Sequence, residues 1–358
     1  MKIVTVVGAR PQFIKAAPVS LALRKCATEM LVHTGQHYDV GLSQVFFDEL
    51  GLPRPDHYLQ VGSGSHAEQT ANILLRLEPV LEQETPDLVL VYGDTNSTLA
   101  GALAAAKLNV PVAHVEAGLR SFNRAMPEEL NRVVTDHLAH VQFCPTQTAV
   151  DHLRDEGIAD RVHQVGDVMY DAGLMYGTRA DETSPILEAL GLTPHEYLLA
   201  TLHRPANVDR PDRLAQLLDA LATLDGPVVL PLHPRTRTRL ADLPDVRAHV
   251  ERAGVRFVDP VGYLDMLRLE RNARCILTDS GGIQKEAYFF AVPCVTLREE
   301  TEWPETLRGG WNVLVGRDRD RILAAATRDR PTQEPEPVFG DGHAALRIAD
   351  ILGRGESA

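Results

Sequence analysis

Three acidic residues stand where short apolar runs give way to polar ones: Asp94, Glu116 and Glu128. Asp94 and Glu116 each follow a run typical of a buried strand, and Glu128 lies in the first turn of a helix that Pro127 would start. Arg132, four residues after Glu128, shares its helix face. Carboxylates held close together push the pKa of one of them upward, which suits removal and return of a proton. Taken singly, Asp94 also fits a helix N-cap, and Glu128 with Arg132 a surface ion pair.

Two cations follow the first apolar run. Arg10 comes after Gly8, where the run Ile3–Val7 ends, and Lys15 stands one turn into the next helical pattern. A glycine turn, a helix N-terminus and two basic side chains together favour an anion-binding site. The alternative is a pair of solvated surface charges.

The C-terminal half carries a second predicted anion site. His203 and Arg204 follow an apolar run, and Ser280 with the two glycines after it opens a helix. Backbone N–H groups at such a turn can approach a diphosphate closely. Glu286, one turn into that helix, can accept hydrogen bonds from ribose hydroxyls. A structural histidine and a Gly-rich turn without a ligand are the competing interpretations. The two glycines are Gly281 and Gly282.

Two other patterns imitate known sites. The segment Gly62–Gly64 resembles a dinucleotide fingerprint, but no convincing buried strand precedes it. Asp136, His137 and His140 have metal-ligand spacing on a helix, but no further ligand cluster accompanies them, which favours a polar helix face. We therefore predict no metal site, no nicotinamide and no other cofactor.

The elements that must position these residues alternate in type along the chain. Brief apolar runs, typical of strands buried on both faces of a parallel sheet, are separated by Ala- and Leu-rich helical patterns. Two doubly wound α/β halves are the simplest interpretation, with a ligand cleft outside the carboxyl ends of their strands. The predicted strands are Ile3–Val7, Leu88–Tyr92, Val112–Val115, Val141–Phe143, Tyr197–Thr201, Val228–Leu230, Arg256–Val258, Cys275–Thr278 and Cys294–Leu297. The predicted helices include Leu99–Lys107, Val133–His140, Arg213–Thr223 and Gly282–Ala291.

The domain boundary is predicted near residue 168. Residues 1–168 would form an N-terminal Rossmann-like domain carrying the carboxylates, and residues 169–341 a C-terminal Rossmann-like domain carrying the diphosphate site. The Pro-rich piece Pro331–Pro337 would link the second domain to a last amphipathic helix in residues 342–358. That helix can pack back on either domain.

Composition narrows the class of protein. The 358 residues include 44% hydrophobic and 24% charged ones, which is ordinary globular usage for about two domains. The net charge of −13 argues against a nucleic-acid binder, because such proteins need clustered Lys and Arg. The four cysteines form no paired spacing, and no apolar stretch reaches the roughly 18 residues of a membrane span. We expect a soluble, cytoplasmic protein.

Taken together, the polar segments resemble those of the non-hydrolysing UDP-N-acetylglucosamine 2-epimerases. The resemblance implies a glycosyltransferase-B fold, two Rossmann-like domains around a cleft, and a homodimer. It also implies epimerisation at C2 of the sugar by anti elimination of UDP to a 2-acetamidoglucal, followed by re-addition of UDP. The matching segments cover nearly the whole chain: GARPQFIKAAP, HTGQHYD, VYGDTNSTLAGALAA, HVEAGLR, MPEELNRVVTDHLA, PTQTAVDHL, TLHRPANV, LTDSGGIQKEA and ETEWPETLRGGWNVLVG.

The resemblance also implies roles for single residues. The carboxylates would handle the C2 proton and balance the charge of the intermediate, Arg132 would orient them, and His203 would stabilise the departing UDP. It does not say which carboxylate is the base. The carboxylates are Asp94, Glu116 and Glu128, and the UDP-binding residues are Arg10, Lys15, Ser280, Gly281, Gly282 and Glu286.

The chain departs from the family pattern in two places. Trp303 stands where simple bacterial members often carry an arginine, and the run 118–127 looks like that of branches acting on modified sugars such as UDP-2,3-diacetamido-2,3-dideoxyglucuronate. The segment Gln36–Asp39 partly matches an activator site for a second UDP-GlcNAc, but Glu68 replaces a cation there, which predicts no such activation. A hydrolysing epimerase, a glycosyltransferase and a catalytically silent sensor of the same fold also fit parts of this pattern.

Overall fold

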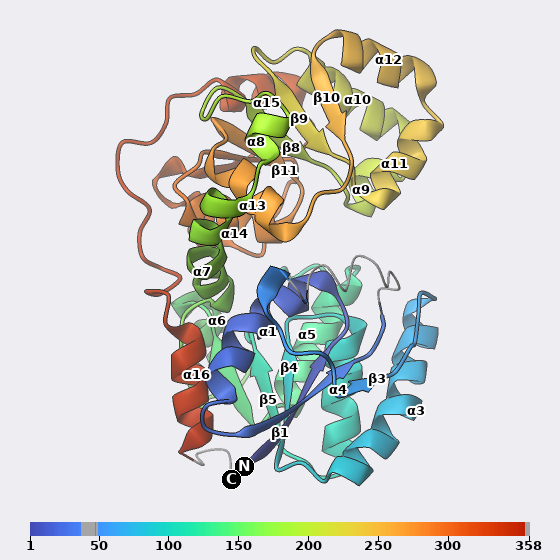
Figure 1. The fold of residues 1–358 in the computed structure, drawn as a ribbon, viewed down its shortest axis with the longest axis vertical. Helices are drawn as coiled ribbons and strands as arrows, with labels where there is room; N and C mark the ends of the chain where they lie inside the picture. The colour runs from blue at the N-terminus through green and yellow to red at the C-terminus, as the bar shows by residue number, and fades with distance from the viewer. Residues whose placement is uncertain (37–46, 48, 355–358) are drawn as a thin grey trace. The chain divides into compact units, whose positions relative to one another are not determined.

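The protein is described by a computed structural model that covers residues 1–36, 47 and 49–354. The chain divides into two compact units (Figure 1). The first unit comprises Met1–Leu174 and Pro337–Ala358, and the second comprises Met175–Glu336. The division thus falls between residues 174 and 175, whereas the sequence places it near residue 168.

The first unit is built on a seven-stranded sheet in the order β3-β2-β1-β4-β5-β6-β7, and every described pairing in it is parallel. Val6 in the first strand lies opposite Val91, and Tyr92 lies opposite Val115, so the loops after these three strands share one edge of the sheet. The strands are β1 (Lys2–Val7), β2 (Thr28–His33), β3 (His57–Tyr58), β4 (Leu88–Tyr92), β5 (Val112–Val115), β6 (Val141–Cys144) and β7 (Val162–Gln164).

Helices cover both faces of this sheet because its central strands are apolar on both sides. The last helix packs against the first, so the C-terminal segment belongs to this unit (Figure 1). The helices are α1 (Arg10–Leu23), α3 (His66–Glu84), α4 (Asn96–Lys107), α5 (Pro127–Leu138), α6 (Gln147–Asp155) and α16 (Ala344–Gly353), and α7 (Val168–Thr183) runs across the division between the units.

The second unit repeats the same plan with a six-stranded sheet in the order β10-β9-β8-β11-β12-β13, again with parallel pairings. Leucine, isoleucine and valine side chains on its two faces form two apolar cores under the helices. The strands are β8 (Leu198–Thr201), β9 (Val228–Pro231), β10 (Val255–Val258), β11 (Cys275–Thr278), β12 (Cys294–Thr296) and β13 (Asn312–Leu314). The helices are α8 (Ile186–Ala189), α9 (Pro205–Val208), α10 (Pro211–Ala222), α11 (Pro234–Ala241), α12 (Pro244–Arg252), α13 (Tyr263–Arg271), α14 (Gly281–Phe289) and α15 (Arg319–Ala326), with a 3-10 helix at Pro304–Gly310.

The chain has two further general properties. In the described residues no helix is both long and apolar enough to cross a membrane. All four cysteines are free thiols, which agrees with their lack of paired spacing in the sequence.

Candidate functional site

In the first unit the predicted residues gather where the strand order reverses, between β1 and β4. Open α/β sheets bind ligands at this point, outside the carboxyl ends of the strands. A Cβ atom added to Gly93, the first residue after β4, would lie 3.1 Å from Oε2 of Glu116 and 3.3 Å from Nζ of Lys15. The structure therefore brings Glu116 and Lys15 to the loop that carries Asp94.

Glu116 and Lys15 form an ion pair at this edge, with the Lys15 ammonium donating to Oε2 of Glu116. Their side chains are only 6% and 10% exposed, so neither is a solvated surface charge. Glu116 also has a φ of +70°, a left-handed conformation that side chains other than glycine adopt reluctantly. Non-glycine residues in such conformations cluster at functional sites. The backbone strain at Glu116 thus points to its carboxylate as functional.

Asp94 is not the N-cap of α4, because Thr95 caps the helix by accepting a hydrogen bond from the backbone N–H of Thr98. The carboxylate of Asp94 instead accepts from Nη2 of Arg132 at 2.5 Å. The side-chain amide of Asn131 donates to the backbone carbonyl of Asp94 at 2.9 Å. The N-cap interpretation of Asp94 is therefore wrong, and α5 holds Asp94 in place through two neighbouring side chains.

Arg132 is buried, so the interpretation of Arg132 and Glu128 as a surface ion pair is also wrong. Besides Asp94, the guanidinium contacts Glu129, whose Oε2 lies 3.1 Å from its Nη1. Glu129 also accepts hydrogen bonds from the backbone amides of Ser121 and Phe122, each at 2.9 Å, and so anchors the loop before α5. Glu128, which directly precedes Glu129 in the first turn of the same helix, is half-buried.

Sequence reasoning missed Glu129 although a signal for it exists. Glu129 is the third residue of α5, after the N-cap Met126. Acidic side chains at that position commonly reach back to backbone amides just before a helix. Applied to residues 127–129, this rule would have assigned Glu129 a loop-anchoring role beside Glu128.

Gln12 ties the turn that carries Arg10 to the turn that carries Asp94. Its Oε1 accepts from the backbone amides of Gly8 and Ala9 at 2.8 and 3.1 Å, and its Nε2 donates to the carbonyl of Tyr92 at 2.9 Å. A Cβ atom at Gly8 would lie only 2.1 Å from Oγ1 of Thr34, so no larger residue fits there. Arg10, the first residue of α1, is half-buried at this edge.

Asp136 is buried, whereas the sequence places it on a polar helix face. Its carboxylate is completely buried and accepts hydrogen bonds from His114 and Arg120, both at 2.7 Å. His137, next to it, instead pairs with Glu156 near the surface at 3.3 Å. Among the residues that the structure describes, no group of three His, Cys, Asp or Glu is placed to hold a metal ion.

In the second unit the predicted residues lie at the equivalent reversal of strand order, between β8 and β11. Asp279, fully buried at the end of β11, accepts hydrogen bonds from the backbone amides of His203 and Arg204, each at 3.0 Å. Asn207 donates to the same carboxylate at 3.1 Å. Asp279 thereby fixes the loop after β8. In the sequence Asp279 falls within a matching segment, but nothing in the pattern there assigns it a role.

The imidazole of His203 is held uncharged at neutral pH. Burial lowers its pKa, the attraction of Asp279 opposes that change, and neighbouring cations such as Arg204 and Arg298 lower the pKa further. A neutral imidazole at the carboxyl edge can donate one N–H to an oxyanion.

The helix α14 begins with the predicted diphosphate residues. Ser280 is its N-cap, with Oγ accepting from the backbone amide of Ile283 at 3.4 Å, and Gly281 and Gly282 form the first turn. The positive end of the helix dipole at this turn favours an anion. Glu286, one turn further, is buried and accepts from the hydroxyl of Tyr263 at 3.1 Å.

Trp303 is buried, and its indole ring lies over the ammonium of Lys285, with Nζ 3.8 Å from the ring centroid. An arginine there would add a cation beside Lys285, whereas the tryptophan stabilises that cation through its π face. The adjacent Glu302 forms a two-point ion pair with Arg298 at 2.8 and 2.9 Å. Burial raises the pKa of Glu302, but Arg298 outweighs it and lowers the pKa to about 2.

The residues that match an activator site are only partly described. Gln36 is buried and its Oε1 accepts from the backbone amide of Ser97 at 3.0 Å, so it braces α4. Glu68 is exposed in the first turn of α3. The remaining residues of this segment, His37, Tyr38 and Asp39, lie outside the described residues.

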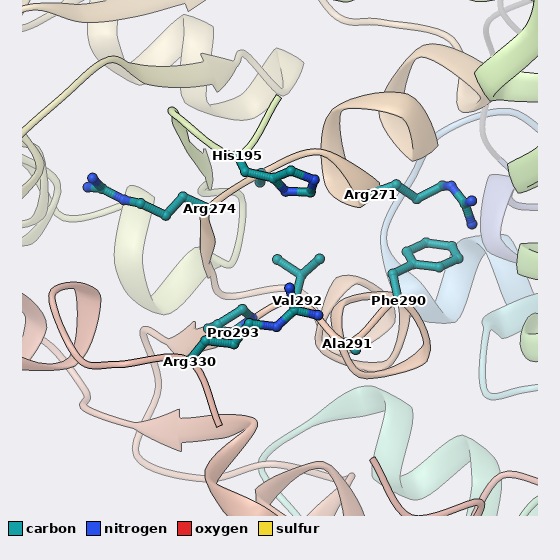
Figure 2. Close-up of a pocket in the computed structure, with 9 residues that line it drawn as sticks. His195, Arg271, Arg274, Phe290, Ala291, Val292, Pro293 and Arg330 are labelled. Atoms are coloured by element: carbon teal, nitrogen blue, oxygen red, sulfur yellow. The ribbon is translucent and has the colours of Figure 1, made fainter. Parts of the chain in front are cut away.

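A pocket of about 160 Å³ lies in the second unit, at the edge of the sheet opposite the loops that carry the predicted site residues. It is lined by residues that precede strands β8, β11 and β12. The guanidinium groups of Arg271 and Arg274 point away from each other in Figure 2, so the cations do not converge on one anion. None of the predicted site residues lines it. The lining residues are His195, Arg271, Ala273, Arg274, Phe290, Ala291, Val292, Pro293 and Arg330.

Comparisons with known proteins place similar sequences and structures along nearly the whole chain. Residues 20–353 match the sequence model of a family described as UDP-N-acetylglucosamine 2-epimerase. A UDP-N-acetylglucosamine 2-epimerase homologue from Methanococcus maripaludis is 50% identical, with 98% of this chain and 99% of that protein covered. The UDP-2,3-diacetamido-2,3-dideoxy-D-glucuronate 2-epimerase of Pseudomonas aeruginosa is 49% identical, with coverage of 99% and 100%.

Among solved structures, the UDP-GlcNAc 2-epimerase of Methanocaldococcus jannaschii, crystallised with UDP-GlcNAc and UDP, superposes with a TM-score of 0.92. It is 42% identical and covers 99% of this chain and 100% of that one. The predicted fold class is confirmed: the protein has two Rossmann-like doubly wound units of the glycosyltransferase-B type.

Proposed function

Because the chain belongs to the UDP-N-acetylglucosamine 2-epimerase family and is an epimerase of UDP-sugars, we propose that it interconverts UDP-N-acetylglucosamine and UDP-N-acetylmannosamine without hydrolysis. The proposal rests mainly on two carboxylates at one edge of the sheet, each of which forms an ion pair with a different basic side chain. Asp94 is held by Arg132, and Glu116 is held by Lys15. Inversion at one carbon needs a proton removed from one face and returned to the other, which two separately held carboxylates can do.

The first unit would perform the proton transfers. One carboxylate takes the weakly acidic C2 proton while the C1–O bond breaks and UDP leaves with the bonding electrons, which gives the 2-acetamidoglucal. UDP then adds back to C1 as a proton returns to the opposite face of C2. Arg132 and Lys15 hold the carboxylates of Asp94 and Glu116 in place, and Glu128 balances the charge of the intermediate.

The second unit would hold UDP, together with Arg10 of the first. The amides of Gly281 and Gly282, next to Ser280, face the diphosphate, and Glu286 accepts from the ribose hydroxyls. His203, uncharged at neutral pH, donates an N–H to the departing phosphate and so stabilises the charge that develops there. We further propose that the protein is a homodimer, which light scattering will test.

Proton NMR of UDP-GlcNAc incubated with the enzyme in D2O tests the reaction. Deuterium at C2, appearing together with UDP-ManNAc, is the expected result. Free ManNAc and UDP would instead identify a hydrolysing epimerase. The variants Asp94→Asn and Glu116→Gln should lower kcat by orders of magnitude while UDP still binds, and unchanged turnover in both would refute the assigned roles.

A second candidate substrate is UDP-2,3-diacetamido-2,3-dideoxyglucuronate, favoured by the 49% identical relative with that activity and by the run 118–127. The kcat/KM values of this nucleotide sugar and of UDP-GlcNAc, measured with the same enzyme preparation, decide between them. A ratio of 100 or more, about 3 kcal/mol in transition-state binding, would identify the physiological class of substrate.

A further inference from the structure

A buried chain of three polar side chains runs beneath the carboxylate-bearing edge of the first unit. His114 in β5, Asp136 in α5 and Arg120 in the loop between them are all nearly inaccessible to solvent. The roles proposed above use none of them. Buried polar groups are costly unless every partner is supplied, and a buried network whose groups are all hydrogen-bonded makes the elements that it joins rigid.

His114 lies between two hydrogen-bond acceptors. Its Nε2 is 2.7 Å from the backbone carbonyl of Gly93, and its Nδ1 is 2.7 Å from Oδ1 of Asp136. The carbonyl of Gly93 can only accept, so Nε2 of His114 donates to it. Burial raises the pKa of Asp136, but hydrogen bonds and charge from His114 and Arg120 outweigh burial and lower it, which keeps the carboxylate ionised.

The other carboxylate oxygen, Oδ2 of Asp136, accepts from Nη1 of Arg120 at 2.7 Å and from the backbone amide of Gly118 at 3.2 Å. Arg120 is itself held by a two-point ion pair with Glu156 at 2.6 and 2.7 Å. Besides the carbonyl of Leu119, to which Arg120 donates at 2.6 Å, the chain ends on two backbone atoms, the carbonyl of Gly93 and the amide of Gly118.

These two backbone atoms flank the carboxylates of the site. Gly93 directly precedes Asp94, and Gly118 stands two residues after Glu116. All three of Gly93, Glu116 and Gly118 have positive φ values, of +60°, +70° and +80°. Positive φ costs the two glycines nothing, but at Glu116 it is a strained conformation that persists only where the surroundings over-determine it. The contacts from His114 and Asp136 supply such a restraint to both loops at once.

We propose that His114, Asp136 and Arg120 are positioning residues that lock the Gly93 and Gly118 peptides and thereby fix Asp94 relative to Glu116. The inference rests on the roles proposed for those two carboxylates. None of the three touches the substrate: they act through the backbone. A displacement of about 1 Å in a reacting group costs roughly 100-fold in rate, which is the effect expected when the chain is cut.

The test compares His114→Phe, which keeps a ring but removes both ring nitrogens, with a matched control in the same unit. Glu29→Gln also alters a buried carboxylate in a polar network, since Glu29 accepts from Thr5 at 2.8 Å and from Arg24 at 2.8 Å. Glu29 lies near the start of β2, away from the carboxyl edge. Asp136→Asn is the near-isosteric second variant, for use if the phenylalanine protein does not fold.

Four quantities are measured on the full-length proteins: kcat, the dissociation constant of UDP, the primary isotope effect with C2-deuterated substrate, and amide hydrogen exchange. For His114→Phe or Asp136→Asn we expect kcat to fall roughly 100-fold. UDP binding should change less than about 2-fold, the isotope effect should rise because proton removal becomes slower, and peptides covering 93–97 and 116–120 should lose protection. Glu29→Gln should lower the melting temperature but move none of these four quantities.

Unchanged exchange in those two peptides would overturn the inference, as would equal losses of kcat in the variants and the control. If the wild-type enzyme turns over no UDP-sugar, the proposed function fails, and hydrogen exchange still decides whether the chain fixes the two loops. The two failures are therefore distinguishable.

Discussion

Replacing Arg298 should destabilise the second unit in a way that depends on pH. Arg298 donates to both carboxylate oxygens of Glu302, at 2.9 and 2.8 Å, and the two side chains are only 10% and 5% exposed. Burial alone would raise the pKa of Glu302, yet the hydrogen bonds and charge of Arg298 bring it down to about 2. Arg298→Met removes the opposing influence and leaves a buried carboxylate.

The magnitude follows from this pKa. Lowering the pKa of Glu302 from 4.5 to about 2 corresponds to about 3 kcal/mol of folding free energy, because one pKa unit is worth about 1.4 kcal/mol. Breaking a buried ion pair by removing one partner costs about 3 to 5 kcal/mol. Arg204, whose Nη2 lies 3.9 Å from Oε1 of Glu302, keeps some positive charge nearby, so we expect the lower end of that range.

The sign of the pH dependence separates this explanation from a packing defect. In the wild type the pKa of Glu302 is depressed, so its stabilisation is complete above pH 4.5 and is lost as the pH falls toward 2. In Arg298→Met only the charge of Arg204 and a backbone hydrogen bond still oppose burial. We expect the pKa of Glu302 to rise above its ordinary value, so that the variant regains stability on acidification from pH 7 to pH 5. The cost of the substitution should therefore shrink over that interval.

Urea unfolding followed by tryptophan fluorescence measures this effect selectively, because both tryptophans of the chain, Trp303 and Trp311, lie in the second unit. Arg298→Met, Glu302→Gln and the double variant complete a thermodynamic cycle. A cost below about 1 kcal/mol at pH 7, or a cost that does not change between pH 7 and pH 5, would refute the reasoning.

Three further outcomes are expected. Gly8→Ala should lower the melting temperature sharply in calorimetry, because its Cβ would lie 2.2 Å from Oγ of Ser97; a change of less than about 2 °C would contradict the packing. Glu286→Ala should weaken UDP binding in titration calorimetry by 10-fold or more and change kcat little, and unchanged affinity would remove Glu286 from the UDP site. Glu270 is fully buried with neither carboxylate oxygen hydrogen-bonded, and burial raises its pKa. Because the pKa of Glu270 is raised, the wild type loses stability as the pH rises above 5. Glu270→Leu should therefore stabilise the second unit by about 1 to 3 kcal/mol, and more at pH 8 than at pH 5. Equal urea midpoints of the variant and the wild type at both pH values would disprove this.

The strands that build the two units could be predicted from sequence where burial is complete on both faces. The nine predicted runs coincide, to within about two residues, with β1, β4, β5, β6, β8, β9, β10, β11 and β12. The missed strands are β2, β3, β7 and β13. In β2 the second residue is a glutamate, which is buried only because Arg24 and two hydroxyls from other elements surround it. The other three are edge strands of two or three residues, too short to show a pattern.

The positions of the site residues could be predicted, whereas their partners could not. Parallel strands place their following loops at one edge, so the residue types after each apolar run already mark that edge. Which cation meets which carboxylate depends on contacts between distant segments. The sequence predicts that Lys15 binds an anionic ligand beside Arg10, but it does not show that the Lys15 ammonium pairs with Glu116, 101 positions away in the sequence. Arg132 likewise pairs with Asp94 and Glu129.

The backbone conformation of Glu116 is a second feature of the site that the sequence does not reveal. The glycines at 93 and 118 indicate left-handed turns in the sequence, because glycine adopts positive φ without cost. A glutamate at φ +70° leaves no such trace, since the strain of about 1 kcal/mol is borne by its surroundings. The backbone amides of Glu116 and Ala117 both donate to the carbonyl of Phe143 at 3.1 Å, and Lys15 of α1 holds the side chain. A glycine at 116 would satisfy the backbone and lose the carboxylate, so a glutamate at this strained position supports the catalytic role that we propose for it.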